Sequence, residues 1–176
     1  MPGALAVVSL ALGSSVVGSL ITQMINLLRE RRRNRREATY LALRLATIFE
    51  KFAEDAVSMI SDMANYENSG GTAGEYSGEV PVLGNLPDER EPWREIPIGL
   101  TSRVLGFEPY RRSVQAGIDS CFEMVGPDEG YPETRKQCVK LGRRALGIAS
   151  DLRSRYRLPA LEMEWDWVST LNNARL

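Results

Sequence analysis

Three groups of side chains in this sequence could do chemistry: two cysteines, a group of carboxylates near the C-terminus and a run of arginines near the N-terminus. Cys121 and Cys138 stand apart, without the CxxC spacing of a structural zinc site. The sequence contains no histidine, so the commonest general base and the commonest metal ligand are both missing. We therefore interpret the cysteines as two free thiols, a state that suits a reducing compartment.

Three carboxylates close to the C-terminus could bind a metal or serve as acid and base. Glu162, Glu164 and Asp166 alternate with apolar side chains in the segment LEMEWDWV, and alternation favours a strand. The plausible pairing segment, EVPVL at 79–83, contains a proline that restricts it to a sheet edge. We favour a short helix from about 165 to 172, because residues two apart on a helix do not face each other. The carboxylates are then solubilising charges beside packed tryptophans.

An enzyme is the weakest of the functional hypotheses. It would need carboxylates such as Glu162 and Asp166, or Cys121 as a nucleophile, and a reactive cysteine needs a lowered pKa. No neighbour of Cys121 in the sequence supplies an obvious base. We therefore expect a protein that is not an enzyme, with no catalytic residue, no cofactor and no metal site.

Six arginines within eight residues form a dense cluster of positive charge. The segment RERRRNRR at 29–36, which we call the collar, contains Arg29, Arg31, Arg32, Arg33, Arg35 and Arg36. An arginine near an anionic membrane surface contributes roughly 1 kcal/mol of attraction. We interpret these six as membrane-surface residues because of the segment that precedes them.

Residues 1–28 carry no charged side chain, and the apolar run at 3–28 exceeds the length of about 20 residues that a membrane-spanning helix needs. Its glycines and serines would weaken a helix in water but are tolerated in lipid. Positive residues stay on the cytoplasmic side of a membrane. We therefore predict a single-pass transmembrane anchor at 1–28 in the cell (inner) membrane, with the N-terminus outside and residues 37–176 in the cytoplasm. The lipid bilayer is the first expected partner.

There are three alternative interpretations of this end of the chain. A cleaved signal peptide has positive charge before its apolar core, whereas here the charge follows it and bulky Leu27 and Leu28 abut the arginines. A buried or oligomer-forming helix is the second alternative. A nucleic-acid clamp is the third, but residues 37–176 hold 16 Lys and Arg against 22 Asp and Glu. An acidic body argues against nucleic-acid binding, so we expect no nucleic-acid partner.

Small residues recur every four positions in the apolar segment. They are Ala11, Ser15 and Ser19 in one row, and Ser14 and Gly18 in another. Small residues at this spacing let two spans approach closely. The pattern indicates packing between the spans of a membrane oligomer, or it arises by chance because small residues are frequent in this segment.

Residues 37–176 are predicted to form an all-α bundle of about three to four helices with one long loop. The first helix, over 37–63, has an apolar stripe at helical spacing. The stripe consists of Leu41, Leu45, Ile48, Phe52, Ala56, Met59 and Met63, widened by Tyr40, Phe49 and Ile60. No Gly or Pro occurs between Arg29 and Met63, so the membrane helix is expected to run into this one, straight or with a bend at the arginines.

Residues 65–98 are rich in Gly, Pro, Ser and Glu and predict a long loop. We expect Trp93 to hold this loop onto its own domain rather than to contact a partner. A second helical stretch runs over 98–125, with a separation near Gly106 and Pro109.

The segment GPDEG at 126–130 predicts a turn, and a third helix follows over 132–156. Five arginines cluster along this helix: Arg143, Arg144, Arg153, Arg155 and Arg157. They form either a second membrane- or phosphate-facing patch or, as we favour, a solvated face with cations near the helix C-terminus.

Several segments carry a family resemblance. They are REATYLALRLATIFEKFA after the collar, the Gly-Gly pair at 70–71, DLRSRYRLP at 151–159 and WDWVSTL at 165–171. In order and spacing the chain from residue 37 on resembles a group of short bacterial and prophage-encoded single-pass membrane proteins with no assigned activity. The resemblance implies a bacterial setting linked to mobile elements and carries over no site residues.

These observations favour a membrane-anchored helical interaction or scaffold module that binds a protein partner or self-associates. The alternative is a phage-related envelope protein, holin-like or excluding other phages, although the body is larger than pore formation requires. A soluble helical oligomer is a further, less favoured hypothesis.

Overall fold

The computed structural model describes residues 3–88, 93–162 and 166–174, with side chains from residue 23 onward. This part of the chain is all-helical and contains no strand, which confirms the prediction of an all-α fold. Its elements are α1 (Gly3–Asn68), the 3-10 helix η1 (Trp93–Glu95), α2 (Ile98–Leu105), α3 (Phe107–Val125), α4 (Pro127–Tyr156) and α5 (Trp167–Asn173).

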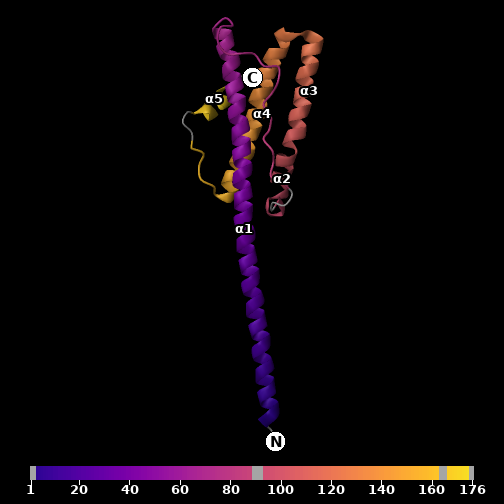
Figure 1. Ribbon diagram of the computed structural model, residues 1–176, viewed down its shortest axis with the longest axis vertical. Coiled ribbons are helices and arrows are strands. Elements are labelled where there is room, and N and C mark those ends of the chain that lie inside the picture. Colours follow the sequence, from indigo (N-terminus) through magenta and orange to yellow (C-terminus); the bar gives the residue numbers. More distant parts are fainter. Residues whose placement is uncertain (1–2, 89–92, 163–165, 175–176) are drawn as a thin grey trace.

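The molecule consists of a short helical bundle from which one end of α1 projects (Figure 1). The C-terminal part of α1 packs along α4, and α3 packs along another side of α4, so α4 is the central helix. The N-terminal part of α1 extends well beyond the bundle, and no other helix runs alongside it in Figure 1. The short helix α2 leads into α3, and α5 packs on α1 and α4.

Helix α1 is a single uninterrupted helix of 66 residues, about 100 Å long at 1.5 Å per residue. The prediction that the apolar segment continues into the first bundle helix is confirmed. From Ala38 onward, one face of α1 is buried at helical spacing. The fully or nearly fully buried positions include Leu41, Leu45, Phe49, Phe52, Ala56, Ile60 and Met63. Tyr40 was predicted to widen this stripe, but its side chain is 60% exposed.

Phe107, at the start of α3, packs against two aromatic rings of α1. Its ring lies edge-on to Phe49 at 5.1 Å and to Phe52 at 4.9 Å between ring centroids. Aromatic pairs prefer this arrangement because the positive edge of one ring meets the negative face of the other. The predicted separation of the second helical stretch is confirmed at Gly106, which lies between α2 and α3.

The predicted turn at 126–130 and the helix start at 132 are wrong. Only Gly126 separates α3 from α4, with a φ of 85° that suits glycine. Pro127 then occupies the first turn of α4, where its missing N–H has no intrahelical partner to lose. The acidic Asp128 and Glu129 follow in the same turn, where the helix dipole favours negative charge. The predicted end at Tyr156 is confirmed.

The long loop starts after Asn68, four residues later than predicted, and apart from η1 its described residues are irregular. Part of it packs on the bundle. Val80 and Leu83 are buried, and the Gln115 side chain on α3 holds the segment before them. The amide of Gln115 accepts the Val80 N–H at 2.8 Å and donates to the Gly78 carbonyl at 3.0 Å. Trp93 packs against the core and donates to the Asp88 carbonyl at 3.4 Å, which confirms that it holds the loop onto the domain.

The C-terminal segment ends in a short helix, as favoured over a strand. Asp166 caps α5 by accepting the Ser169 N–H at 3.0 Å. Of the other two carboxylates considered in this segment, Glu162 is exposed. Glu164 lies among residues 163–165, which are outside the described residues.

Within the residues that the structure describes, no helix is long and apolar enough to cross a membrane. The side chains of residues 3–22, most of the predicted span, lie outside the described part. The same holds for the proposed packing positions Ala11, Ser14, Ser15, Gly18 and Ser19.

Candidate anion-binding site at the base of the bundle

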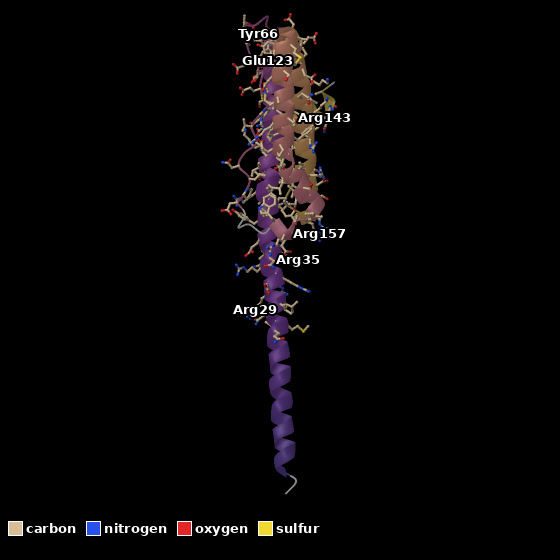
Figure 2. All side chains as sticks on the ribbon, turned by 90° about the vertical axis from the view of Figure 1, so that its right-hand side faces the viewer. Arg29, Arg35, Tyr66, Glu123, Arg143 and Arg157 are labelled. Carbon is tan, nitrogen blue, oxygen red and sulfur yellow. The ribbon has the colours of Figure 1, made fainter. Side chains whose placement is uncertain are left out.

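The base of the bundle is the level at which α1 leaves its packing partners. Ala38 is the first buried residue of α1, and the described residues before it are exposed or half-buried. Arg31, Arg32 and Arg35 lie on the last two turns of α1 before Ala38, and all three are exposed. Figure 2 shows Arg35 at the lower end of the bundle, close to the level of Arg157 and above Arg29.

The C-terminal end of α4 is fixed at this level by Arg153. Its guanidinium makes two hydrogen bonds to the Glu50 carboxylate on α1, the second at 2.7 Å, and it also donates to the Pro159 carbonyl. Glu50 is only 5% exposed, so the pair is largely withdrawn from water. The bonded carboxylate raises the pKa of Arg153 above its usual value and keeps the guanidinium charged. The pair ties α4 to α1 and to the chain that follows α4.

Arg157 ends α4 in a left-handed conformation, with φ 51° and ψ 44°. The Leu158 N–H bonds the Arg153 carbonyl at 3.0 Å and the Arg157 N–H bonds the Ser154 carbonyl at 3.4 Å, the pattern of a Schellman motif. Glycine usually occupies this position, since a left-handed backbone costs an L-residue about 1–2 kcal/mol. Arg157 is the one non-glycine residue with positive φ in the described part of the chain.

Two adjoining open cavities lie between these elements. The larger, of about 500 Å³, is lined by Arg35 of α1, by Arg155, Tyr156 and Arg157 of α4, and by Glu95 of η1. The smaller, of about 370 Å³, shares Arg35 and Glu95 and adds Arg31 and Arg32 from the collar. Within the described part of the chain, the walls thus carry five arginines and one glutamate. We call these two cavities together the basal site.

Tyr156 connects the two walls of the basal site. Its hydroxyl donates to the Glu95 backbone carbonyl at 2.9 Å, which holds η1 against the end of α4. Partial burial raises the pKa of Tyr156, so its hydroxyl stays protonated and continues to donate. The larger cavity therefore has a fixed frame between α1, η1 and α4.

The arginines of the basal site differ from those elsewhere in the fold. Among the described residues, no carboxylate lies within ion-pair distance of Arg35, Arg155 or Arg157. By contrast, the collar's Arg33 pairs with Glu37 at 2.7 Å, outside this site. Guanidinium groups that share a cavity and have no carboxylate partner among the described residues can donate to the oxygens of an anion, and phosphate suits their planar donor geometry.

The five arginines that the sequence grouped along α4 fall into two sets. Arg143 donates to the carbonyls of Leu171, Asn172 and Ala174 at 3.1, 2.9 and 2.7 Å and so holds the C-terminal segment. Arg144 stacks on the Tyr110 ring at 4.2 Å, and Arg153 pairs with Glu50. Only Arg155 and Arg157 reach the basal site.

The collar is divided in a similar way. Arg31, Arg32 and Arg35 line the basal site, Arg33 forms its ion pair and Arg29 is exposed below it. Arg36 lines a neighbouring apolar groove of about 370 Å³ with Tyr40 and Leu43, and Arg35 borders both this groove and the basal site.

Glu95 and Tyr156 were not identified from the sequence as site residues. Glu95 lies near the end of the long loop, and Tyr156 is the last residue of the third predicted helix. Neither residue carries a sequence signal for the contact between them, because 61 positions separate them along the chain.

The thiols and carboxylates considered as chemical groups lie elsewhere. Burial raises the pKa of Cys138 to about 12, so that thiol is protonated at ordinary pH. Cys121 is half-buried on α3, and Asp166 caps α5. No cluster of three or more Cys, Asp or Glu able to hold a metal occurs in the part of the chain that the structure describes.

Comparison of the chain with family models, with curated proteins and with solved structures returned no match.

Proposed function

We propose that the protein is a membrane-anchored helical module whose bundle is held at the cytoplasmic face of a membrane as an interaction or scaffold domain. The observation that carries this proposal is the continuity of α1. One helix joins the uncharged apolar segment, the collar and the buried stripe of the bundle without interruption. The position of the bundle relative to the apolar segment is therefore set by a helix rather than by a flexible linker.

The projecting end of α1 needs a partner that the bundle does not supply. Met24, Ile25, Leu27 and Leu28 are 43–65% exposed immediately before the collar. A helix rich in Gly, Ser and Val has little intrinsic stability in water, and most helices of proteins are stabilised by packing of an apolar face. In a lipid bilayer the same segment must be helical, because its backbone has no water to bond.

The collar supports the orientation. Its arginines begin directly after the apolar segment, where a cytoplasmic membrane surface retains positive residues. The body that follows holds the excess of acidic residues and would face the cytoplasm as the interaction domain. The resemblance to prophage-encoded single-pass proteins is consistent with this arrangement.

Alkaline carbonate extraction of membranes that contain the full chain tests the anchor, since carbonate strips peripheral proteins. We expect the protein to remain in the membrane pellet. A Val16→Arg variant, with a charge near the centre of the span at a cost of about 3 kcal/mol, should shift part of the protein to the supernatant. Release of the unmodified protein would overturn the proposal and favour a helical oligomer.

Orientation needs a separate measurement, because extraction does not report it. A reporter that is active only outside the cytoplasm, fused to the C-terminus, should be inactive, while a cytoplasmic reporter at the same place should be active. The reverse result would contradict the orientation and leave the anchor intact.

A further inference from the structure

We propose that the basal site binds the phosphate group of an anionic phospholipid. This inference rests on the proposed membrane anchor for the source of the phosphate, but the binding chemistry belongs to the cavity itself. Arg35 from α1 and Arg155 and Arg157 from α4 converge on one cavity of about 500 Å³. That volume accommodates a phosphate group together with part of its headgroup.

The basal site carries more positive charge than is needed to stabilise the negative C-terminal end of α4. The C-terminus of α4 carries the equivalent of about half a negative charge, and Arg153 already lies in its last turn. Glu95 is the one carboxylate among the described residues that line either cavity. Arg31, Arg32, Arg35, Arg155 and Arg157 therefore leave a positive cavity that an anion would neutralise.

The height of the cavity fits a membrane surface. Arg35 lies seven residues after Leu28, so it is about 10 Å further along α1. The headgroup layer on each side of a bilayer is roughly 5–8 Å thick. Side chains on a helix lean toward its N-terminus, and on α1 that direction leads to the apolar segment. On α1, Arg35 can therefore extend its guanidinium from the bundle toward the headgroup layer.

Arg157 provides a second observation that points to a ligand. It occupies the position of a Schellman motif at which glycine is favoured, and its side chain lines the cavity. A residue in a disfavoured backbone conformation suggests a role for its side chain other than stability. An Arg157→Gly variant should therefore fold more stably and bind the anion less well, a combination that misfolding cannot produce.

The experiment measures thermal unfolding of the full chain in a nonionic detergent, by circular dichroism, with sodium phosphate or sodium chloride at matched ionic strength. At phosphate concentrations of roughly ten times the Kd, the wild-type Tm should rise by about 4 °C. Without phosphate, Arg157→Gly should raise Tm by about 3 °C. The double variant Arg155→Gln, Arg157→Gly should lose most of the phosphate effect.

Arg135→Gln is the matched control. It removes one positive charge from the opposite end of the same helix, where Arg135 pairs with the exposed Glu67 at 3.1 Å. Phosphate also stabilises proteins generally by exclusion from their surface, and this control should retain both the general and the specific effect. An equal response to phosphate in the control and the double variant would overturn the proposal.

Nanodiscs identify the source of the phosphate. In discs of phosphatidylcholine, addition of phosphatidylglycerol should raise the wild-type Tm, and the double variant should respond less. A response to free phosphate without a response to phosphatidylglycerol would overturn the lipid assignment and leave a site for a soluble phosphate. A larger response to a short DNA duplex than to either phosphate source would assign the arginines to nucleic acid instead.

The two proposals fail in distinguishable ways. Protein that leaves the membrane in carbonate but keeps its phosphate response would refute the anchor and retain the basal site. Protein that stays in the membrane without any response to phosphate or phosphatidylglycerol would refute the basal site alone.

Discussion

The two parts of α1 have opposite environments although they belong to one helix. From Ala38 to Met63 the helix buries an apolar stripe against α4 and the loop. From residue 23 to 36 its described side chains are exposed, apart from a half-buried Asn34. From residue 23 to 36 no Gly or Pro interrupts the helix, and from Ala38 to Met63 the helix is stabilised by packing. The comparison shows that helical continuity alone does not reveal which part of a long helix stabilises the fold.

Two leucines on α1 give the strongest test of this difference. Leu45 is fully buried and Leu27 is 58% exposed. Leu45→Ala should lower the free energy of unfolding by about 3 kcal/mol, because it removes buried methyl groups and leaves a cavity. Leu27→Ala should change it by less than about 0.5 kcal/mol. Guanidinium unfolding of the full chain in detergent measures both, and equal effects would contradict the division of α1.

Two ion pairs provide a second matched test on the same helix. Glu50 pairs with Arg153 inside the bundle, whereas Glu37 pairs with Arg33 at side-chain exposures of 43% and 79%. Glu50→Gln should cost about 3 kcal/mol, because Arg153 then remains largely buried without its carboxylate. Glu37→Gln should cost less than about 0.5 kcal/mol.

Urea unfolding at low and at high salt measures these costs and adds a control, because urea is uncharged whereas guanidinium chloride itself screens charges. Salt should weaken the exposed pair more than the buried one. A cost of Glu50→Gln that disappeared in high salt would show that the pair is solvated.

Two helical glycines extend the comparison to the other helices. A Cβ on Gly142 of α4 would lie 3.2 Å from the Ala56 Cβ on α1 and 3.0 Å from Leu171, whereas nothing lies within 4 Å of one on Gly117 of α3. Gly142→Ala should destabilise by about 1–3 kcal/mol through crowding. Gly117→Ala should stabilise by roughly 0.5–1 kcal/mol through reduced backbone entropy of the unfolded chain. If both variants shifted the Tm in the same direction, the close packing of Gly142 against Ala56 and Leu171 would be contradicted.

The smallest expected effect concerns the thiols, whose labelling leaves the fold unchanged. Cys138 is buried with a pKa raised to about 12, whereas Cys121 is half-buried on α3. At pH 8 the Cys138 thiolate is a negligible fraction, since deprotonation requires a pH near 12. A maleimide should label one thiol per folded chain and two after unfolding, as counted by mass spectrometry. Equal labelling of both in the folded protein would show that α4 opens readily.

Local patterns in the sequence predicted most of the helices and failed at particular junctions. The stripe over 37–63 and the break at Gly106 were predictable, because apolar spacing and glycine act locally. The start of α4 was not, because Pro127 and Gly130 are typical of turns and also fit a first helical turn. A helix supported by tertiary packing overrides the turn signal of such residues.

The basal site could be predicted only in part. The collar and the arginines at 155 and 157 were visible as charge clusters, but their convergence depends on the antiparallel packing of α1 and α4. Glu95 belongs to a loop whose path follows from contacts such as the Gln115 amide with Val80 and Gly78. No residue pattern near Glu95 specifies that path.

The unbroken α1 helix also fixes a rotational phase. Each residue inserted into the collar would turn the bundle by about 100° about the helix axis and move it by about 1.5 Å. An insertion of seven residues nearly restores the facing direction, whereas an insertion of two turns the basal site to the opposite side. The number of residues in the collar therefore sets which side of the bundle faces any neighbour that holds the N-terminal segment.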